Sequence, residues 1–235
     1  MRIKLLLLIA STSALTIAHG LTFTANTNLQ IYNGNGNSGF GGAIGGAALE
    51  LNDDGTNISG TLTKGSGDFN DSLVIFIDSV PGGFSDTSAL TDVGDTGRRN
   101  ASWGATNTLT FESGFEADYA ISFDVGDFLG LFQLGTPTNT FVTGIGAAGS
   151  ATDATFSLDF SLADIGIAAN DSFNFIGLYW NPTGGTGGFQ SDEAFGVNIT
   201  GGNVGSNSFA VPEPSSYALL FGCTAAALIA LRRRH

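Results

Sequence analysis

Oxygen-bearing side chains gather in two short segments of this sequence. One contains Asp53 and Asp54, and the other contains Asp68, Asn70 and Asp71. Carboxylate and amide oxygens are the ligands that Ca²⁺ takes in proteins, so both segments are candidate calcium sites. Neither has the EF-hand spacing, because no Glu closes the loop at the twelfth position. The favoured alternative is that these Asp and Asn side chains bond their own backbone in turns.

A second candidate is the basic pair Arg98 and Arg99, which stands in a strongly acidic part of the chain. Guanidinium groups bind carboxylates and sulfates bidentately, so the pair could hold an acidic group of a polymer. The favoured alternative is that the pair neutralises the nearby acids Asp92, Asp95 or Glu112.

Histidine and cysteine are absent between residues 21 and 210, since the chain holds them only as His19, His235 and Cys223. This absence excludes a Ser-His-Asp triad, a Cys-His pair and a His or Cys zinc site from the body of the protein. It also excludes disulfides there, so we expect stability to come from an ordinary hydrophobic core.

Glycoside hydrolysis remains open, because it needs only two suitably separated carboxylates. Glu112 with Glu116, or Asp192 with Glu193, could be named as such a pair. Acidic residues are so abundant that neither pair is singled out by the sequence. We therefore expect a protein that is not an enzyme.

The charge of the body limits its partners. Residues 21–210 contain 20 acidic residues and three basic ones, Lys64, Arg98 and Arg99, a net charge of −17. Nucleic acids and anionic membranes attract basic surfaces, so neither is an expected partner of the body. The excess of acidic over basic residues is compatible with solubility outside the cell and with the binding of cations.

Short runs of β-branched, aromatic and leucine residues alternate with Gly, Asn and Asp clusters, a pattern typical of strands joined by turns. A helical turn is indicated only at 162–167. We expect one all-β domain over residues 21–210, a jelly-roll-like β-sandwich. Glycine fills seven of the 14 positions in 33–46, which indicates a flexible loop. The predicted strands are 21–25, 57–63, 73–77, 108–111, 119–123, 155–162 and 172–180.

Two features of these strands are specific enough to test. The unbroken apolar run Leu73 to Ile77 indicates a central strand that is buried on both faces. In contrast, Phe156, Leu158 and Phe160 alternate with polar residues, which indicates a single face against the core.

The order of several short motifs between residues 68 and 195 is similar to that of family 9-like carbohydrate-binding and DOMON-like sandwiches. These motifs are Asp71 to Gly83, the Arg98-Arg99 pair, Phe115 to Ile121, and Asp171 to Phe175 followed by Ser191 to Phe195. The resemblance implies binding of an extracellular polysaccharide. It makes the aromatic residues candidates for stacking on a sugar ring, with core packing as the alternative. These candidates are Trp103, Tyr179 and Trp180.

The two ends of the chain predict export. Residues 1–20 have a basic start, an apolar run and small residues before position 21, as a cleaved signal peptide does. Residues 215–231 are nearly all apolar and precede Arg232, Arg233 and Arg234. We expect 215–231 to be a transmembrane helix with the arginines on the cytoplasmic side and the body outside.

The C-terminal residues resemble a known sorting signal. Val211, Pro212, Glu213 and Pro214 stand before the apolar segment and the arginines, and this order resembles the PEP-CTERM signal of Gram-negative bacteria that make extracellular polysaccharide. The resemblance covers residues 211–235 and implies recognition by exosortase, a membrane-embedded protease that cuts near Pro-Glu-Pro. The two prolines keep this site extended and outside the helix that follows.

Together these observations predict a membrane-anchored precursor in the cell envelope, then a structural or adhesive protein of the outer surface or extracellular matrix. A carbohydrate-binding module is the alternative, and a glycoside hydrolase comes third. We expect no cofactor other than calcium.

Overall fold

The structure is a computed structural model that describes residues 21–25, 29–105, 107–124, 128–147, 149–182, 188–196, 204–205 and 208–210. The predicted signal peptide at 1–20 and the predicted sorting tail at 211–235 lie outside these ranges. Within them, no helix is long and apolar enough to cross a membrane.

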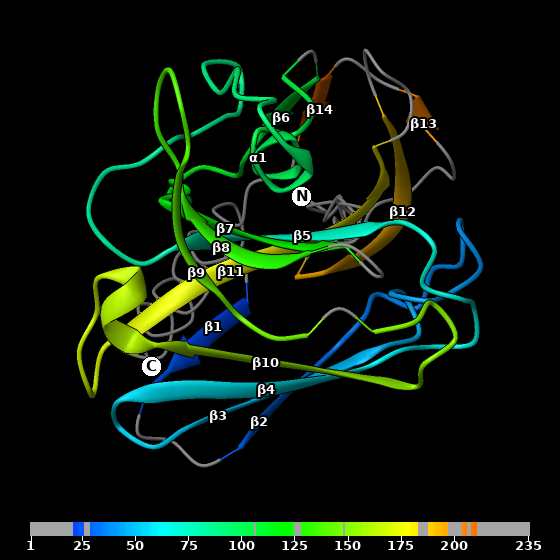
Figure 1. Cartoon of the computed structure of the whole chain (residues 1–235), viewed down its shortest axis with the longest axis horizontal. Helices are drawn as coiled ribbons and strands as arrows, with labels where there is room; N and C mark the ends of the chain where they lie inside the picture. Colours follow the sequence, from blue (N-terminus) through cyan, green and yellow to red (C-terminus); the bar gives the residue numbers. More distant parts are fainter. Residues whose placement is uncertain are drawn as a thin grey trace, which may run out of the picture.

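Two antiparallel sheets form most of the domain, so the predicted all-β class is confirmed (Figure 1). The larger sheet has the order β13 (Val204–Gly205), β12 (Phe189–Phe195), β11 (Ser172–Asn181), β5 (Ser72–Asp78), β7 (Tyr119–Asp124), β8 (Leu129–Gln133) and β9 (Thr140–Gly144), and β1 (Leu21–Thr24) also pairs with β11. The smaller sheet has the order β10 (Thr155–Ser161), β4 (Asn57–Thr63), β3 (Ala48–Asp53) and β2 (Gln30–Asn33).

A third layer covers the outer face of the larger sheet. It contains α1 (Thr96–Ala101) and the parallel pair β6 (Thr108–Thr110) and β14 (Ser208–Ala210). Figure 1 shows this layer and the smaller sheet on opposite sides of the larger sheet. The larger sheet therefore has two buried faces.

Strand β5 confirms the predicted central strand, because it pairs with β11 on one side and with β7 on the other. Its side chains alternate between two cores, as successive residues of a strand must. Leu73, Ile75 and Ile77 belong to the core between the sheets, whereas Val74 and Phe76 belong to the core under the third layer. Burial on both faces explains why the run from Leu73 to Ile77 contains no polar residue.

The smaller sheet is buried on one face only. Phe156, Leu158 and Phe160 are at most 4% exposed, while the residues between them are exposed, so the predicted alternation is confirmed. The predicted helical turn is present as the short 3₁₀ helix η1 (Leu162–Ile165), which Ser161 and Asp164 cap reciprocally. Helix α1 was not predicted, because its sequence Thr-Gly-Arg-Arg-Asn-Ala lacks the regular spacing of apolar residues that indicates a helix.

Candidate functional site

The three aromatic residues proposed to stack on a sugar are buried, so their faces are not available to a ligand in this structure. Trp103, Tyr179 and Trp180 are 2%, 0% and 1% exposed. Trp103 and Trp180 stack on each other with ring centroids 4.8 Å apart. Tyr179 points to the opposite face of the larger sheet, since it neighbours Trp180 in the same strand. The core-packing alternative describes all three residues.

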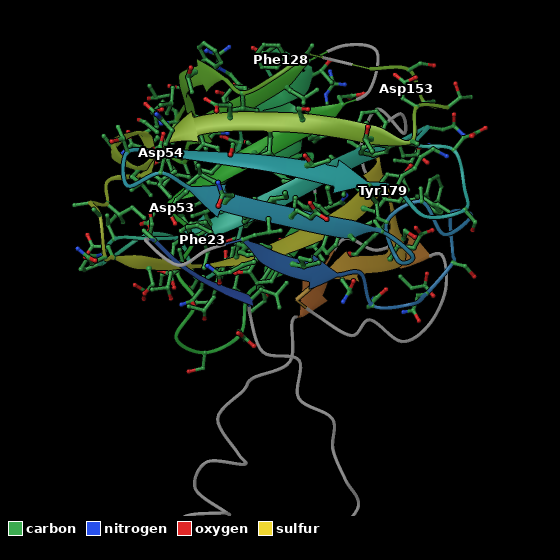
Figure 2. The ribbon with its side chains drawn as sticks, turned by 90° about the horizontal axis from the view of Figure 1, so that it is seen from below. Phe23, Asp53, Asp54, Phe128, Asp153 and Tyr179 are labelled. Carbon is green, nitrogen blue, oxygen red and sulfur yellow. The ribbon has the colours of Figure 1, made fainter. Side chains whose placement is uncertain are left out.

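The acidic calcium candidates lie in separate places. In Figure 2, Asp53 and Asp54 are at one end of the smaller sheet and Tyr179 is at the other. Asp71 belongs to the second end, because its backbone N–H donates to the Tyr179 hydroxyl at 3.0 Å. Asp54 accepts from the backbone N–H groups of Thr56 and Asn57, as the turn alternative predicts.

Two further contacts of these acids are local. Asp53 accepts from the N–H of Gly55, and Asp68 lies 3.7 Å from the Lys64 ammonium. Asn70 is exposed. Among the described residues, no group of three or more Asp, Glu, His or Cys side chains could hold a metal ion.

Arg98 lies among acids, as the structural alternative for the basic pair predicts. Its Nε lies 3.4 Å from the Asp92 carboxylate, and its Nη1 contacts the carboxylate of Asp95. Asp95 also caps α1 by accepting from the backbone N–H of Arg98 at 2.8 Å. Arg99 makes no ion pair within the part of the chain that the structure describes.

An open pocket of about 420 Å³ lies beside Arg98. Arg98, Asp95 and the adjacent α1 residues Thr96 and Gly97 form one side, and three phenylalanines form the other: Phe128, Phe132 and Phe141. We call this the Arg98 pocket. It is the described concavity that combines charged groups with aromatic rings, and so it is our candidate ligand site.

Close packing positions the two sides of the pocket. A Cβ at Gly97 would lie 2.5 Å from Cζ of Phe132, so glycine lets α1 approach the aromatic side. The helix is also fixed to β7 by a hydrogen bond of 2.9 Å from Asn100 Nδ2 to Ser122 Oγ. Phe132 and Phe141 are cross-strand partners in β8 and β9. Most of the pocket lining therefore belongs to α1, β8 and β9.

Comparison with known proteins identifies no relative of this chain. No family model, no curated protein and no solved structure matches it. Any function must therefore be argued from the residues and their geometry.

A second unusual feature is a buried carboxylate, that of Glu193 in β12, which is 0% exposed. Its Oε1 accepts from the backbone N–H groups of Phe40 and Gly42, at 2.7 and 3.0 Å. Its Oε2 accepts from those of Ile44 and Gly45, at 2.8 and 3.1 Å. We call this arrangement the Glu193 nest. Four backbone donors replace the water that the charge loses on burial.

The glycine-rich stretch 33–46 forms this nest, and most of it is an irregular connection between β2 and β3, where the sequence indicated a loop. Further bonds fix it, because the side-chain amides of Asn35 and Asn37 donate to the Asp192 carbonyl at 2.7 and 2.9 Å. A Cβ at Gly45 would lie 1.9 Å from the Asn37 carbonyl oxygen. Glycine is required here because two backbone segments touch.

Of the two acid pairs considered for hydrolysis, Asp192 and Glu193 are held in structural hydrogen bonds. Glu193 is enclosed in its nest, and Asp192 Oδ1 accepts from the N–H of Gly39 at 2.8 Å. Glu112 is 5% exposed, whereas Glu116 is exposed. Neither pair lines the Arg98 pocket.

Burial raises the pKa of three aspartates, Asp71, Asp78 and Asp118. Neighbouring carboxylates add to this effect, since Asp124 and Glu193 raise the pKa of Asp71 and Asp118 raises that of Asp78. A carboxyl with a higher pKa in the folded than in the unfolded state binds protons more tightly when folded. Its contribution therefore favours folding near its unfolded pKa of about 4 and is lost as the pH rises through the folded pKa.

We accordingly expect the urea midpoint of unfolding to rise when the pH is lowered from about 7 to about 5. The substitution Asp78→Asn should reduce this rise, because it removes one of the three groups. Asp54→Asn is the control, since backbone N–H groups of Asn57 and Thr56 lower the pKa of Asp54. A midpoint that falls between about pH 7 and about pH 5 would contradict this assignment.

Proposed function

We propose that this protein is an exported, non-enzymatic component of the outer surface or extracellular matrix, with a structural or adhesive role. Its body is a jelly-roll-like β-sandwich, and its C-terminal residues 211–235 are a PEP-CTERM signal that exosortase processes. Before processing, the segment 215–231 anchors the precursor in the membrane.

The order of Pro-Glu-Pro, apolar segment and arginines at residues 211–235 carries this proposal, and the described strands are compatible with the expected processing sites. The first described strand, β1, begins at Leu21, the first residue after the expected signal peptide. The last described strand, β14, ends at Ala210, immediately before Val211. Removal of residues 1–20 and cleavage near Pro212 to Pro214 would therefore leave every described strand in the mature protein.

The side chains of the body agree with a non-enzymatic role. Residues 21–210 have no histidine or cysteine, and the Glu193 carboxylate is committed to four backbone donors. The buried tryptophans contribute to packing, and their ring faces are covered.

Mass spectrometry of the protein from its bacterial host tests the sorting proposal. We expect the mature chain to begin near Leu21 and to end near Pro212 to Pro214. The double substitution Pro212→Ala and Pro214→Ala should retain the uncleaved form, because the site would lose its fixed extended geometry.

Pro81→Ala is the matched control for this experiment, because Pro81 is an exposed proline far from the tail in sequence. It should be processed as the wild type is. A wild-type chain that extends to His235 at the cell surface would refute processing, and a full-length cytosolic chain with residues 1–20 intact would refute export.

A further inference from the structure

Strand β2 is an edge strand with a row of open backbone groups. It is the last strand of the smaller sheet, whose outer face is seen in Figure 2, and it pairs with β3 alone. The Gly34 N–H donates to the Ala47 carbonyl and so continues this ladder by one residue. Because bonded positions alternate along an antiparallel strand, the N–H and C=O groups of Ile31 and Asn33 point away from β3. Among the described residues, no other element bonds these groups.

The side chains of this edge are uncharged and partly apolar. Ile31 and Leu29 are 55% and 52% exposed. They stand on either side of Gln30 in the sequence, so both lie on the outer face of the smaller sheet, opposite the face of the buried Tyr32. Natural edge strands often carry a charge or a proline that prevents pairing with another chain. The sequence of β2, Gln-Ile-Tyr-Asn, contains neither.

The other edges of the two sheets are protected. In β1, the carbonyl of Thr22 accepts from the Tyr32 hydroxyl at 2.8 Å. In β10, the Asp159 N–H donates to the Ile145 carbonyl at 2.6 Å. Strand β9 contains a register shift against β8, and β13 has only two residues. Bulges and short strands disfavour further pairing, so β2 is the edge at which an added strand meets the fewest obstacles.

We propose that β2 pairs antiparallel with β2 of a second copy of this chain, which joins the two smaller sheets into one continuous sheet. A twofold axis relates two identical antiparallel strands, so the outward N–H groups of one copy face C=O groups of the other. The same contact covers Ile31 and Leu29. This inference goes beyond the proposed sorting and does not depend on it.

The distribution of charge favours a second copy as the partner. The acid nearest to the edge is Glu50 of β3, which is the cross-strand neighbour of Ile31. In the paired sheet, the two copies of Glu50 are three strand spacings apart, about 14 Å. This separation exceeds the Debye length of about 8 Å at physiological salt. Two acidic bodies can therefore meet at β2 without bringing carboxylates into contact.

The dimer should be weak and should depend on salt. The open edge is short, because the Asn35 N–H already donates to the Ala194 carbonyl of β12 at 2.9 Å. Each body also carries a net charge of −17, so the two copies repel each other at low salt. We expect association at protein concentrations of roughly 100 µM and above. It should be severalfold tighter in about 500 mM than in about 50 mM sodium chloride.

Sedimentation equilibrium of the full chain in excess detergent measures this association. We expect the protein mass to rise toward twice that of one chain as the concentration increases. Residue-resolved hydrogen exchange then locates the contact. The Ile31 amide should exchange about tenfold more slowly at high than at low protein concentration. The Tyr32 amide, which faces Leu49 of β3, should not change.

Ile31→Lys is the decisive variant, because it places like charges close together at the paired edges. The exposure of Ile31 should let the variant fold, with an unchanged circular dichroism spectrum. We expect its dissociation constant to rise about tenfold or more. Val93→Lys is the matched control, since it makes the same change of charge at another apolar residue, which is 47% exposed. It should associate as the wild type does.

Three results would overturn the inference. The first is the mass of a single chain at every concentration. The second is equal association of the Ile31→Lys and wild-type chains, which would assign the contact to another surface, such as the apolar tail. The third is exchange of the Ile31 amide that does not depend on concentration. If Ile31→Lys loses its folded spectrum, Leu29→Lys provides the second measurement, and an unchanged dissociation constant would count against the β2 edge.

Discussion

Replacing Glu193 by glutamine is expected to lower the free energy of unfolding by about 3 to 5 kcal/mol. The carboxylate accepts two backbone N–H groups at each oxygen. Glutamine has nearly the same shape, but one of the two oxygens becomes an NH₂ group that cannot accept. Two buried N–H donors then face a third donor, and each unsatisfied donor costs about 1 to 3 kcal/mol.

Thermal and urea denaturation measure this effect. For a domain of this size, we expect the melting temperature to fall by roughly 10 °C. Glu50→Gln is the matched control, because Glu50 is a partly exposed glutamate that lines an open pocket of about 360 Å³ on the smaller sheet. It should shift the melting temperature by less than about 2 °C. If the Glu193→Gln and Glu50→Gln variants have the same melting temperature, the four hydrogen bonds contribute little to stability.

Truncating Trp180 to alanine should have a comparable effect, a loss of about 3 to 5 kcal/mol. Trp180 stacks on Trp103 at 4.8 Å between the larger sheet and the third layer, and both rings are buried. The ring is closely packed, because a Cβ at Gly104 would lie 3.1 Å from the Trp180 ring. A large cavity would therefore remain after truncation.

Trp180→Phe separates packing from hydrogen bonding. Among the described residues, the Trp180 Nε1–H has no hydrogen-bond partner. Phenylalanine therefore removes volume without removing a bond, and we expect a smaller loss of about 1 to 2 kcal/mol. Phe189→Ala at the surface should cost less than about 0.5 kcal/mol in the same urea titration. Equal midpoints for Trp180→Ala and Phe189→Ala would show that the ring does not support the core.

Part of the strand pattern could be predicted from the sequence, because a buried strand face requires apolar residues at a regular spacing. Each predicted strand is present, including β5 between two cores and β10 over one. The strands that were not predicted are β2, β3, β8, β9, β12, β13 and β14. Polar residues interrupt β3 and β12. In β12, Gln190, Ser191, Asp192 and Glu193 stand in a row, yet three of the four are buried. Their burial depends on distant backbone donors, which no local pattern reveals.

The candidate site was predictable only in part. The sequence singled out Arg98 and its acidic neighbours, and the structure brings Arg98 together with Asp92 and Asp95. It gave no reason to select Phe128, Phe132 and Phe141, because apolar residues in strands are usually core. Their meeting point depends on the pairing of β8 with β9 and on the close approach of Gly97. The tryptophans were misleading for the same reason, since composition does not distinguish a buried ring from an exposed one.

The Glu193 nest joins the two sheets without a covalent bond, since Glu193 lies in the larger sheet and the glycine-rich stretch connects β2 with β3 of the smaller one. Many exported domains cross-link such a junction with a disulfide bond, whose formation requires an oxidant and which thiols can reduce. Here the hydrogen bonds of the Glu193 carboxylate connect the two sheets instead. The assembled body should therefore be indifferent to reducing agents and to oxygen supply, and its maturation needs no thiol oxidoreductase.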